Sequence, residues 1–262
     1  MYTNISEHTF LLLGDAHVVA DDFELYGQNP ARRLKSIVSA IKEDHPEILA
    51  AFMLGDIAHG GQDREYDVAN EILSDLDCPV YAVAGNHDNR DALVSHFPAL
   101  RMTSTGYVQY SAIINGIRFI ILDTVDESSS NGNLCSSRLE WLEKELLSSD
   151  EQVVLLMHHP PLAVGYRVDS IRIHDVSPFL RVIDSYRQRI RHIVFGHIHR
   201  TVSGTWEGIP FAGLRGTGHQ RIEPQKGRNG GIDHGVPAFA ILKIRENSTV
   251  IQFRDISVDR SP

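Results

Sequence analysis

The sequence predicts an α/β fold in which a parallel β-sheet, covered by helices, is followed by a more antiparallel part. Short apolar runs alternate with amphipathic stretches, a pattern typical of strands buried on both faces. Five of these apolar runs end directly in Gly, Asp, Asn or His. From about residue 201 onward, strands follow one another without long helices between them. We find no linker or internal repeat, so we expect one domain over residues 1–262.

The first third of the chain predicts three strand–loop–helix units. Apolar runs at residues 9–13, 49–54 and 80–84 are predicted strands. Asn29-Pro30 marks a helix start, because Asn caps helices and Pro suits the first turn. The apolar stripe that follows is spaced for one face of that helix and contains Leu34, Ile37, Val38 and Ile41. Residues 66–76 predict a second helix.

The middle of the chain predicts a hairpin and then further strand–helix units. Strands at residues 107–114 and 117–122 flank Asn115-Gly116, a strong turn signal. Ser137 and Glu140 have the spacing of a capping box ahead of an apolar helix face. Residues 153–157 and 192–195 are predicted strands, and Ser177-Pro178 starts the helix between them.

The C-terminal part predicts four strands, at residues 201–206, 209–212, 238–244 and 249–253. Glu207-Gly208 and Asn247-Ser248 are the expected turns. The Gly-rich segment 226–235 is expected to be a solvated loop, although a substrate lid is the alternative.

Composition limits the classes of partner. The chain has 262 residues, 42% of them hydrophobic and 23% charged, and a formal charge of −9. An acidic chain is a poor candidate for nucleic-acid binding, but a bound metal can still attract small phosphate esters. Cys78 and Cys135 are too few for a disulfide framework and favour a reducing compartment. The first apolar run, after Glu7, is too short for a signal peptide or membrane span. We therefore expect a cytoplasmic protein without membrane partners that could form homo-oligomers.

Five groups of potential ligands follow the predicted strands: Asp15-Ala16-His17, Gly55-Asp56, Gly85-Asn86-His87-Asp88, His158-His159 and Gly196-His197-Ile198-His199. Each group alone is more typical of an ordinary loop than of a metal site. Together they predict a metal site, because parallel strands bring their carboxyl ends to one sheet edge. Imidazole, carboxylate and amide ligands suit Zn, Fe, Mn or Co better than Ca. Seven ligands suggest two ions that share a carboxylate.

These motifs, spread over residues 15–199, resemble those of the calcineurin-like metallophosphoesterase superfamily. The resemblance implies a four-layer αββα sandwich with mixed sheets and two divalent or trivalent ions. One ion would be bound by Asp15, His17, Asp56 and His199. The other would be bound by Asp56, Asn86, His158 and His197, so that Asp56 bridges. His87 would contact the phosphate without binding metal.

Further motifs resemble the class III cyclic-nucleotide phosphodiesterases and the bacterial glycerophosphodiesterases of that branch. They are Leu25-Tyr26-Gly27, the segment 158–162 (His-His-Pro-Pro-Leu), the segment 208–211 and Gly218-His219-Gln220. The resemblance implies that His219 reaches the site. The alternative is that His219 is an ordinary loop histidine. Tyr26 is a weaker candidate for substrate contact. Ala16 stands where relatives often carry Thr, but it is not a ligand position.

The predicted activity is hydrolysis of small phosphodiesters by a metal-dependent phosphoric diester hydrolase. A hydroxide generated by the ions would attack phosphorus, while Asn86, His87 and His219 stabilise charge and His87 protonates the leaving alcohol. A phosphomonoesterase is the main alternative. Six arginines on or near the ligand loops could favour a monoester dianion: Arg64, Arg90, Arg167, Arg200, Arg215 and Arg221. A non-catalytic scaffold and a nuclease are less favoured.

Overall fold

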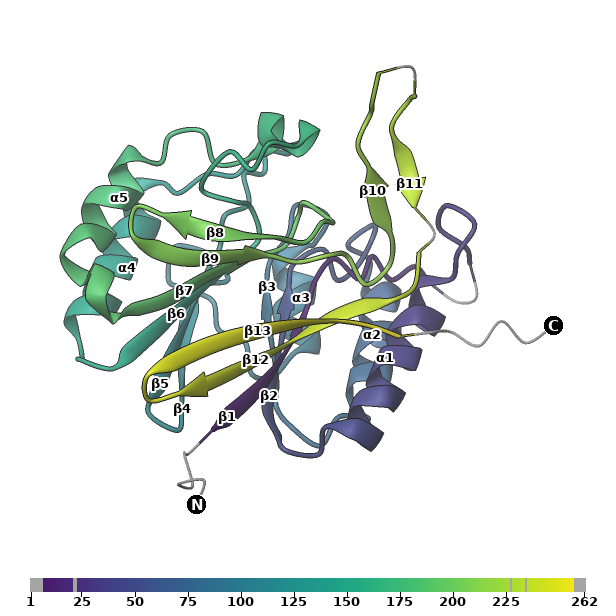
Figure 1. Ribbon diagram of the computed structural model, residues 1–262, viewed down its shortest axis with the longest axis horizontal. Helices are drawn as coiled ribbons and strands as arrows, with labels where there is room; N and C mark the ends of the chain where they lie inside the picture. Colours follow the sequence, from purple (N-terminus) through teal and green to yellow (C-terminus); the bar gives the residue numbers. More distant parts are fainter. Residues whose placement is uncertain (1–6, 21–22, 227, 234, 257–262) are drawn as a thin grey trace.

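The computed structural model describes residues 7–20, 23–226, 228–233 and 235–256, and its core is two stacked β-sheets (Figure 1). The first sheet has the strand order β13-β12-β1-β2-β3. Its strands are β1 (His8–Leu13), β2 (Ile48–Leu54), β3 (Val80–Val83), β12 (Ala238–Arg245) and β13 (Ser248–Asp255). The strands β1, β2 and β3 are parallel, whereas β12 is antiparallel to both β1 and β13. The C-terminal strands therefore complete the N-terminal sheet.

The second sheet has the order β4-β5-β6-β7-β9-β8. Its strands are β4 (Tyr110–Ile114), β5 (Ile117–Leu122), β6 (Gln152–Met157), β7 (Ile190–Phe195), β8 (Val202–Trp206) and β9 (Ile209–Gly213). The central strands β5, β6, β7 and β9 are parallel, and β4 and β8 close the two edges in antiparallel pairing. A separate two-stranded ribbon, β10 (Gln220–Ile222) and β11 (Gly231–Asp233), extends away from both sheets (Figure 1).

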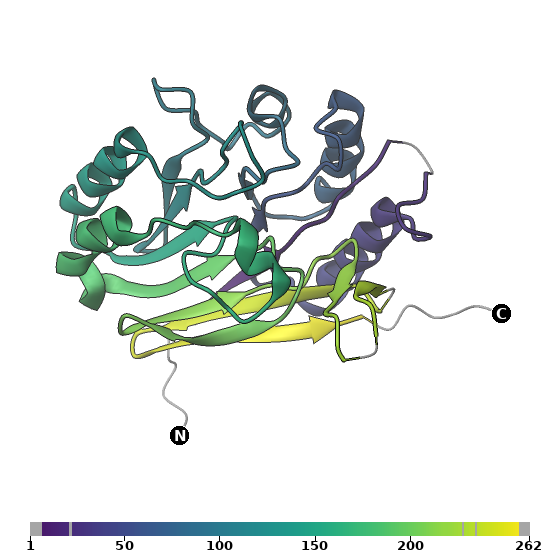
Figure 2. The same cartoon turned by 90° about the horizontal axis from the view of Figure 1, so that it is seen from above.

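Helices lie on the outer sides of the two sheets (Figures 1 and 2). On the side of the first sheet are α1 (Pro30–Asp44), α2 (Asp63–Leu73) and α3 (Arg90–His96). On the side of the second are α4 (Ser136–Leu147) and α5 (Ser177–Ile183). Two 3₁₀ helices, η1 (Arg167–Ile171) and η2 (Asp184–Arg189), flank α5.

Successive side chains along the strands of the second sheet point to opposite faces, and both faces are apolar interfaces. Phe119 and Ile121 of β5 belong to the core shared with the first sheet, whereas Ile120 and Leu122 pack with α4 and α5. The Phe119 ring lies 4.7 Å from that of Phe10 and 4.4 Å from that of Phe52, which joins the two sheets. The order helix–sheet–sheet–helix confirms the predicted sandwich.

Several local predictions are confirmed. Asn29 caps α1, because its side-chain oxygen accepts from the Arg32 N–H at 2.9 Å. All four residues of the predicted α1 stripe are buried. Asn115 and Gly116 have φ angles of 50° and 79°, so they turn the chain between the paired residues Ile114 and Ile117.

Other local predictions are wrong. The capping box at Ser137 does not form, because the N-cap of α4 is Cys135, two residues earlier, and it makes no side-chain cap bond among the described residues. The helix predicted at 66–76 spans Asp63–Leu73 instead. Its start is stabilised by Glu65, whose carboxylate accepts from the N–H groups of Gly60 and Gln62.

Three further corrections concern β-structure. Arg245 pairs with Ser248, so residues 246 and 247 form the turn predicted at 247–248. The strand predicted from 107 begins only at Tyr110. The Gly-rich segment is not only a loop, because β11 lies within it and pairs with β10. No helix in the described ranges is long and apolar enough to cross a membrane.

Candidate metal centre

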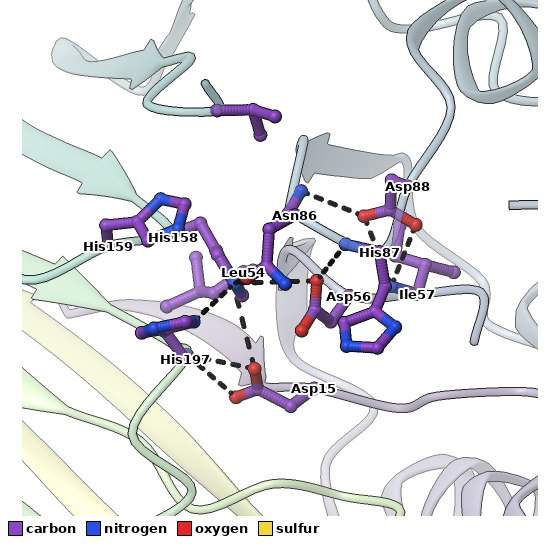
Figure 3. A network of polar contacts seen from close by, with 12 residues as sticks. Asp15, Leu54, Asp56, Ile57, Asn86, His87, Asp88, His158, His159 and His197 are labelled. Carbon is purple, nitrogen blue, oxygen red and sulfur yellow. Dashed lines mark hydrogen bonds and ion pairs between the residues drawn. The ribbon is translucent and has the colours of Figure 1, made fainter. Parts of the chain in front are cut away.

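All five predicted ligand groups meet at the carboxyl ends of the parallel strands. The loops after β1, β2 and β3 come from one sheet and those after β6 and β7 from the other, and Figure 3 shows their side chains converging. Residues of four of the five groups line a cavity of about 620 Å³: His17, Asp56, Asn86, His87, His197 and His199. The site edge that the sequence predicted is therefore formed by two sheets rather than one.

The first cluster contains Asp15, His17, Asp56 and His199, all buried, with one ligand atom each within 4.8 Å of the others. The Nε2 atom of His17 lies 3.2 Å from Nε2 of His199 and 3.4 Å from Oδ2 of Asp56. Nε2 of His199 lies 3.6 Å from Oδ1 of Asp15. These four residues are those predicted for the first ion.

The second cluster is centred on Nε2 of His158. This atom lies 3.1 Å from Nδ1 of His197, 3.2 Å from Oδ1 of Asn86 and 3.5 Å from Oδ1 of Asp56. The two oxygens of Asp56 thus face different histidines, one in each cluster. A carboxylate in this position can contact two ions at once.

Hydrogen bonds from the histidine rings to backbone carbonyls outside the clusters determine which ring nitrogens face the clusters. Nδ1 of His158 donates to the Leu54 carbonyl at 2.8 Å, and Nδ1 of His199 donates to the His219 carbonyl at 3.0 Å. Each ring therefore presents an unprotonated Nε2 to its cluster. Lone pairs and carboxylate oxygens facing one another at 3.1–3.6 Å repel unless a cation lies between them. The residues consequently fit bound metal ions.

Burial also favours the neutral form of histidines in both clusters. It lowers the pKa of His17, His197 and His199 well below the usual histidine value, and neighbouring histidines add to the effect. The neutral imidazoles that result are the form that binds metal. Burial and the nearby Asp56 raise the pKa of Asp15 well above its usual range. A bound cation reverses this shift, because it favours the carboxylate.

The ligand loops have a strained backbone. The φ angles are positive at five non-glycine positions of the candidate ligand set: Asp15 (42°), His17 (46°), Asp56 (49°), His197 (65°) and His199 (50°). Such angles are uncommon outside glycine and often mark functional sites. Hydrogen bonds across the sheets hold them, since the His197 N–H donates to both Asp15 oxygens at 2.9 and 3.1 Å.

Gly85 allows the loop after β3 to approach Asp56. A Cβ atom there would lie 2.2 Å from the Asp56 nitrogen and 2.3 Å from its Oδ1. We expect Gly85→Ala to displace Asp56 and to weaken metal binding by roughly 10–100-fold, as loss of ligand orientation does elsewhere. Mn²⁺ titration measures the change. Gly231→Ala is the control, because its added methyl meets no described atom within 4 Å; equal affinity of the two variants would contradict the expectation.

The predicted substrate contacts also lie at this centre. His87 lines the cavity, its N–H donates to Asp56 Oδ1 at 2.9 Å, and its Nδ1 donates to the His59 carbonyl at 2.8 Å. The His219 ring lies 4.4 Å from that of His199, and neither of its nitrogens has a hydrogen-bond partner in the described part of the chain. Burial and Arg221 lower the pKa of His219 to about 3. Tyr26 lines the cavity 5.1 Å from the His219 ring.

Sequence reasoning missed several neighbours of the centre. His59, which approaches His17, was not considered. His159 was seen only as part of the His158-His159 group and lies buried beside His158 and His197. Asp88 was seen only as part of a motif. It accepts from the N–H groups of Ile57, Ala58 and Gly85 and so ties two ligand loops together. Burial and Asp56 raise its pKa to about 7. Only proximity in sequence to Asp56 or to other ligands could have indicated these residues.

The far wall of the cavity comes from η1 and from the β10–β11 ribbon. Of the six arginines considered above, Arg167 and Arg221 line this cavity. Arg90 instead forms an ion pair with Asp123 at 2.7 Å, and Arg215 forms one with Asp255 at 2.6 Å. The wall contains part of the Gly-rich segment 226–235, for which a substrate lid was the alternative expectation. Its remaining residues carry no metal-ligand motif.

Comparison with known families agrees with this geometry. Residues 8–201 match the family model of the calcineurin-like phosphoesterases. The chain belongs to the calcineurin-like phosphoesterase family. This membership confirms the resemblance inferred from the motifs and makes the chain a metal-dependent phosphoesterase.

Curated relatives place this phosphoesterase in the predicted branch. A probable cyclic nucleotide phosphodiesterase of Rhodopseudomonas palustris is 37% identical over 216 residues, covering 80% of this chain and 78% of the relative. A probable glycerophosphodiester phosphodiesterase of Arcobacter nitrofigilis is 31% identical over 171 residues, 63% of this chain and 62% of the relative. A dimetal phosphatase from Danio rerio superposes with a TM-score of 0.74 at 20% identity, covering 95% and 96% of the two chains, and shows the shared fold.

Proposed function

We propose that this phosphoesterase is a dinuclear phosphodiesterase that hydrolyses small phosphodiesters of the glycerophosphodiester or cyclic-nucleotide type. The observation that carries the proposal is the position of Asp56, whose two oxygens face His17 and His158 at 3.4 and 3.5 Å. One ion would be held by Asp15, His17, Asp56 and His199, and the other by Asp56, Asn86, His158 and His197. The described residues would act as one domain around this centre.

When bound, two such ions supply a nucleophilic hydroxide at neutral pH and neutralise charge on the phosphoryl oxygens. The chain's own residues position the substrate and complete the proton transfers. Asn86 and His87 lie on one loop at the base of the cavity, so both can contact a phosphoryl oxygen. Because Nδ1 of His87 donates to the His59 carbonyl, its Nε2 is the ring atom left to exchange a proton with the leaving alcohol.

His219 would contribute a contact from the other side of the cavity. Its ring is 3% exposed, lies between His199 and Tyr26, and has no hydrogen-bond partner among the described residues. A buried imidazole without a partner is costly, and a substrate oxygen would satisfy it. Its lowered pKa keeps it neutral, so it would act as a hydrogen-bond donor rather than as a cation.

The dinuclear assignment predicts two metal ions per chain. Two clusters share one carboxylate, so saturation with Mn²⁺ should give two equivalents in elemental analysis and two ions in a crystal structure. Preparations that hold one ion or none in excess Mn²⁺ would contradict the assignment. A loaded protein without activity on any phosphate ester would instead favour the scaffold alternative.

The substrate class predicts faster cleavage of diesters than of monoesters. A monoester dianion binds two cations tightly in its ground state, which lowers KM without raising kcat. The curated relatives are also named as phosphodiesterases. The comparison is kcat/KM for bis(4-nitrophenyl) phosphate against 4-nitrophenyl phosphate. A monoester preference above about tenfold, or 1.4 kcal/mol in transition-state binding, would reverse the assignment.

The monoesterase alternative has one structural observation in its favour. Arg167 and Arg221 line the cavity, and a guanidinium group can pair with the second charge of a monoester. Arg221 lies on β10, two residues after His219. Arg221→Ala should therefore reduce any monoesterase activity more than diesterase activity.

A further inference from the structure

His59 contacts two histidines of the site through two different groups. Its ring atom Nδ1 lies 3.3 Å from Nδ1 of His17. Its backbone carbonyl accepts from Nδ1 of His87 at 2.8 Å. The ring also stacks on that of His87, with centroids 5.1 Å apart and planes inclined by 22°. His59 follows Asp56 by three residues, in the loop after β2, and is not among the proposed ligands.

The contact with His17 bears on the tautomer of that ring. Nε2 of His17 faces Asp56 and His199, so it is the coordinating atom in the proposed centre. An imidazole that coordinates through Nε2 carries its proton on Nδ1, and that N–H needs an acceptor. Nδ1 of His59 is within reach to accept this proton. His59 must then carry its own proton on Nε2.

We propose that His59 is a positioning residue, whose ring orients His17 for metal binding and whose carbonyl orients His87 for proton transfer. The inference rests on the proposed function, because it takes His17 to be a ligand. The two roles are separable by mutation. His59→Ala removes the ring and its hydrogen bond to His17, but keeps the backbone carbonyl that accepts from His87.

His59→Ala should therefore affect metal affinity more than it affects turnover. In His59→Ala, the His17 ring loses its outer partner, and loss of such a partner typically weakens metal affinity by about 10–100-fold. His87 keeps its acceptor and loses only the stacked His59 ring, so kcat measured at saturating Mn²⁺ should fall far less than in His87→Ala. A residue that takes part in the chemical step would show the reverse pattern.

The experiment is calorimetric titration of the metal-free full chain with Mn²⁺, followed by kinetics at saturating Mn²⁺. His59→Asn should restore most of the affinity, because its side-chain oxygen lies near the position of the imidazole Nδ1. His59→Gln places its amide farther out and should restore less. His45→Ala is the matched control, since His45 caps α1 and its ring contacts Glu47, away from the cavity.

Three results would overturn the inference. Equal Mn²⁺ affinity of wild type and His59→Ala would show that the ring does not orient His17. A fall in kcat at saturating Mn²⁺ as large as that of His87→Ala would make His59 part of the chemistry. Equal affinities of the Asn and Gln variants would exclude an acceptor at the Nδ1 position. Failure of the proposed function is distinguishable, because the wild type itself would then not bind two Mn²⁺ ions.

Discussion

Asp56→Ala is expected to lose both metal ions and essentially all activity. Each Asp56 oxygen faces a histidine of a different cluster, at 3.4 and 3.5 Å, so the substitution removes a ligand from both proposed ions. Loss of a residue that only orients a ligand weakens metal affinity by roughly 10–100-fold. Loss of Asp56 should weaken Mn²⁺ affinity by more than about 100-fold, because Asp56 is itself a proposed ligand. Titration with Mn²⁺ and elemental analysis measure it directly.

Thermal unfolding provides an independent measurement of the same change. A ligand that binds only the folded state raises the unfolding temperature by mass action, so excess Mn²⁺ should stabilise the wild type but not Asp56→Ala. His158→Ala is the comparison, because it removes a ligand from one cluster only. If Asp56→Ala keeps both ions and turns over substrate normally, Asp56 does not bridge. If it loses no more metal than His158→Ala, Asp56 serves a single ion.

His87→Ala is expected to have the second-largest effect, with kcat lower by roughly 10²–10⁴, the usual contribution of a general acid. The metal content should be retained, because His87 is not a proposed ligand. Its contact with Asp56 is made by the backbone N–H, which alanine keeps. The pair of variants thus separates a group that holds metal from one that acts on the substrate.

The leaving group tests the role of His87 further. Nitrophenolate departs without a proton, whereas an alkoxide needs one. The rate loss in His87→Ala should therefore be much smaller for nitrophenyl diesters than for alkyl diesters. Equal losses for both would assign His87 to phosphate binding rather than to proton donation, and loss of Mn²⁺ binding would assign it to the metal centre.

The predicted elements with strong local causes are those that the structure confirms. Asn29-Pro30 and Asn115-Gly116 were identified correctly, because a cap and a positive-φ turn depend on only a few adjacent residues. Element boundaries were less predictable. Ser137 has the spacing of a cap, but the N-cap of α4 is Cys135, two residues earlier.

The sequence alone determined the family and the loops that carry the candidate metal ligands, because the motifs directly follow apolar strands along the chain. Tertiary structure alone decided what surrounds them. His59, the wall formed by η1 and the β10–β11 ribbon, and the neighbours of His219 depend on contacts between distant segments. Asp56 likewise faces two histidines because loops from two sheets meet at this site. Local sequence does not encode such distances, because they result from how the sheets stack.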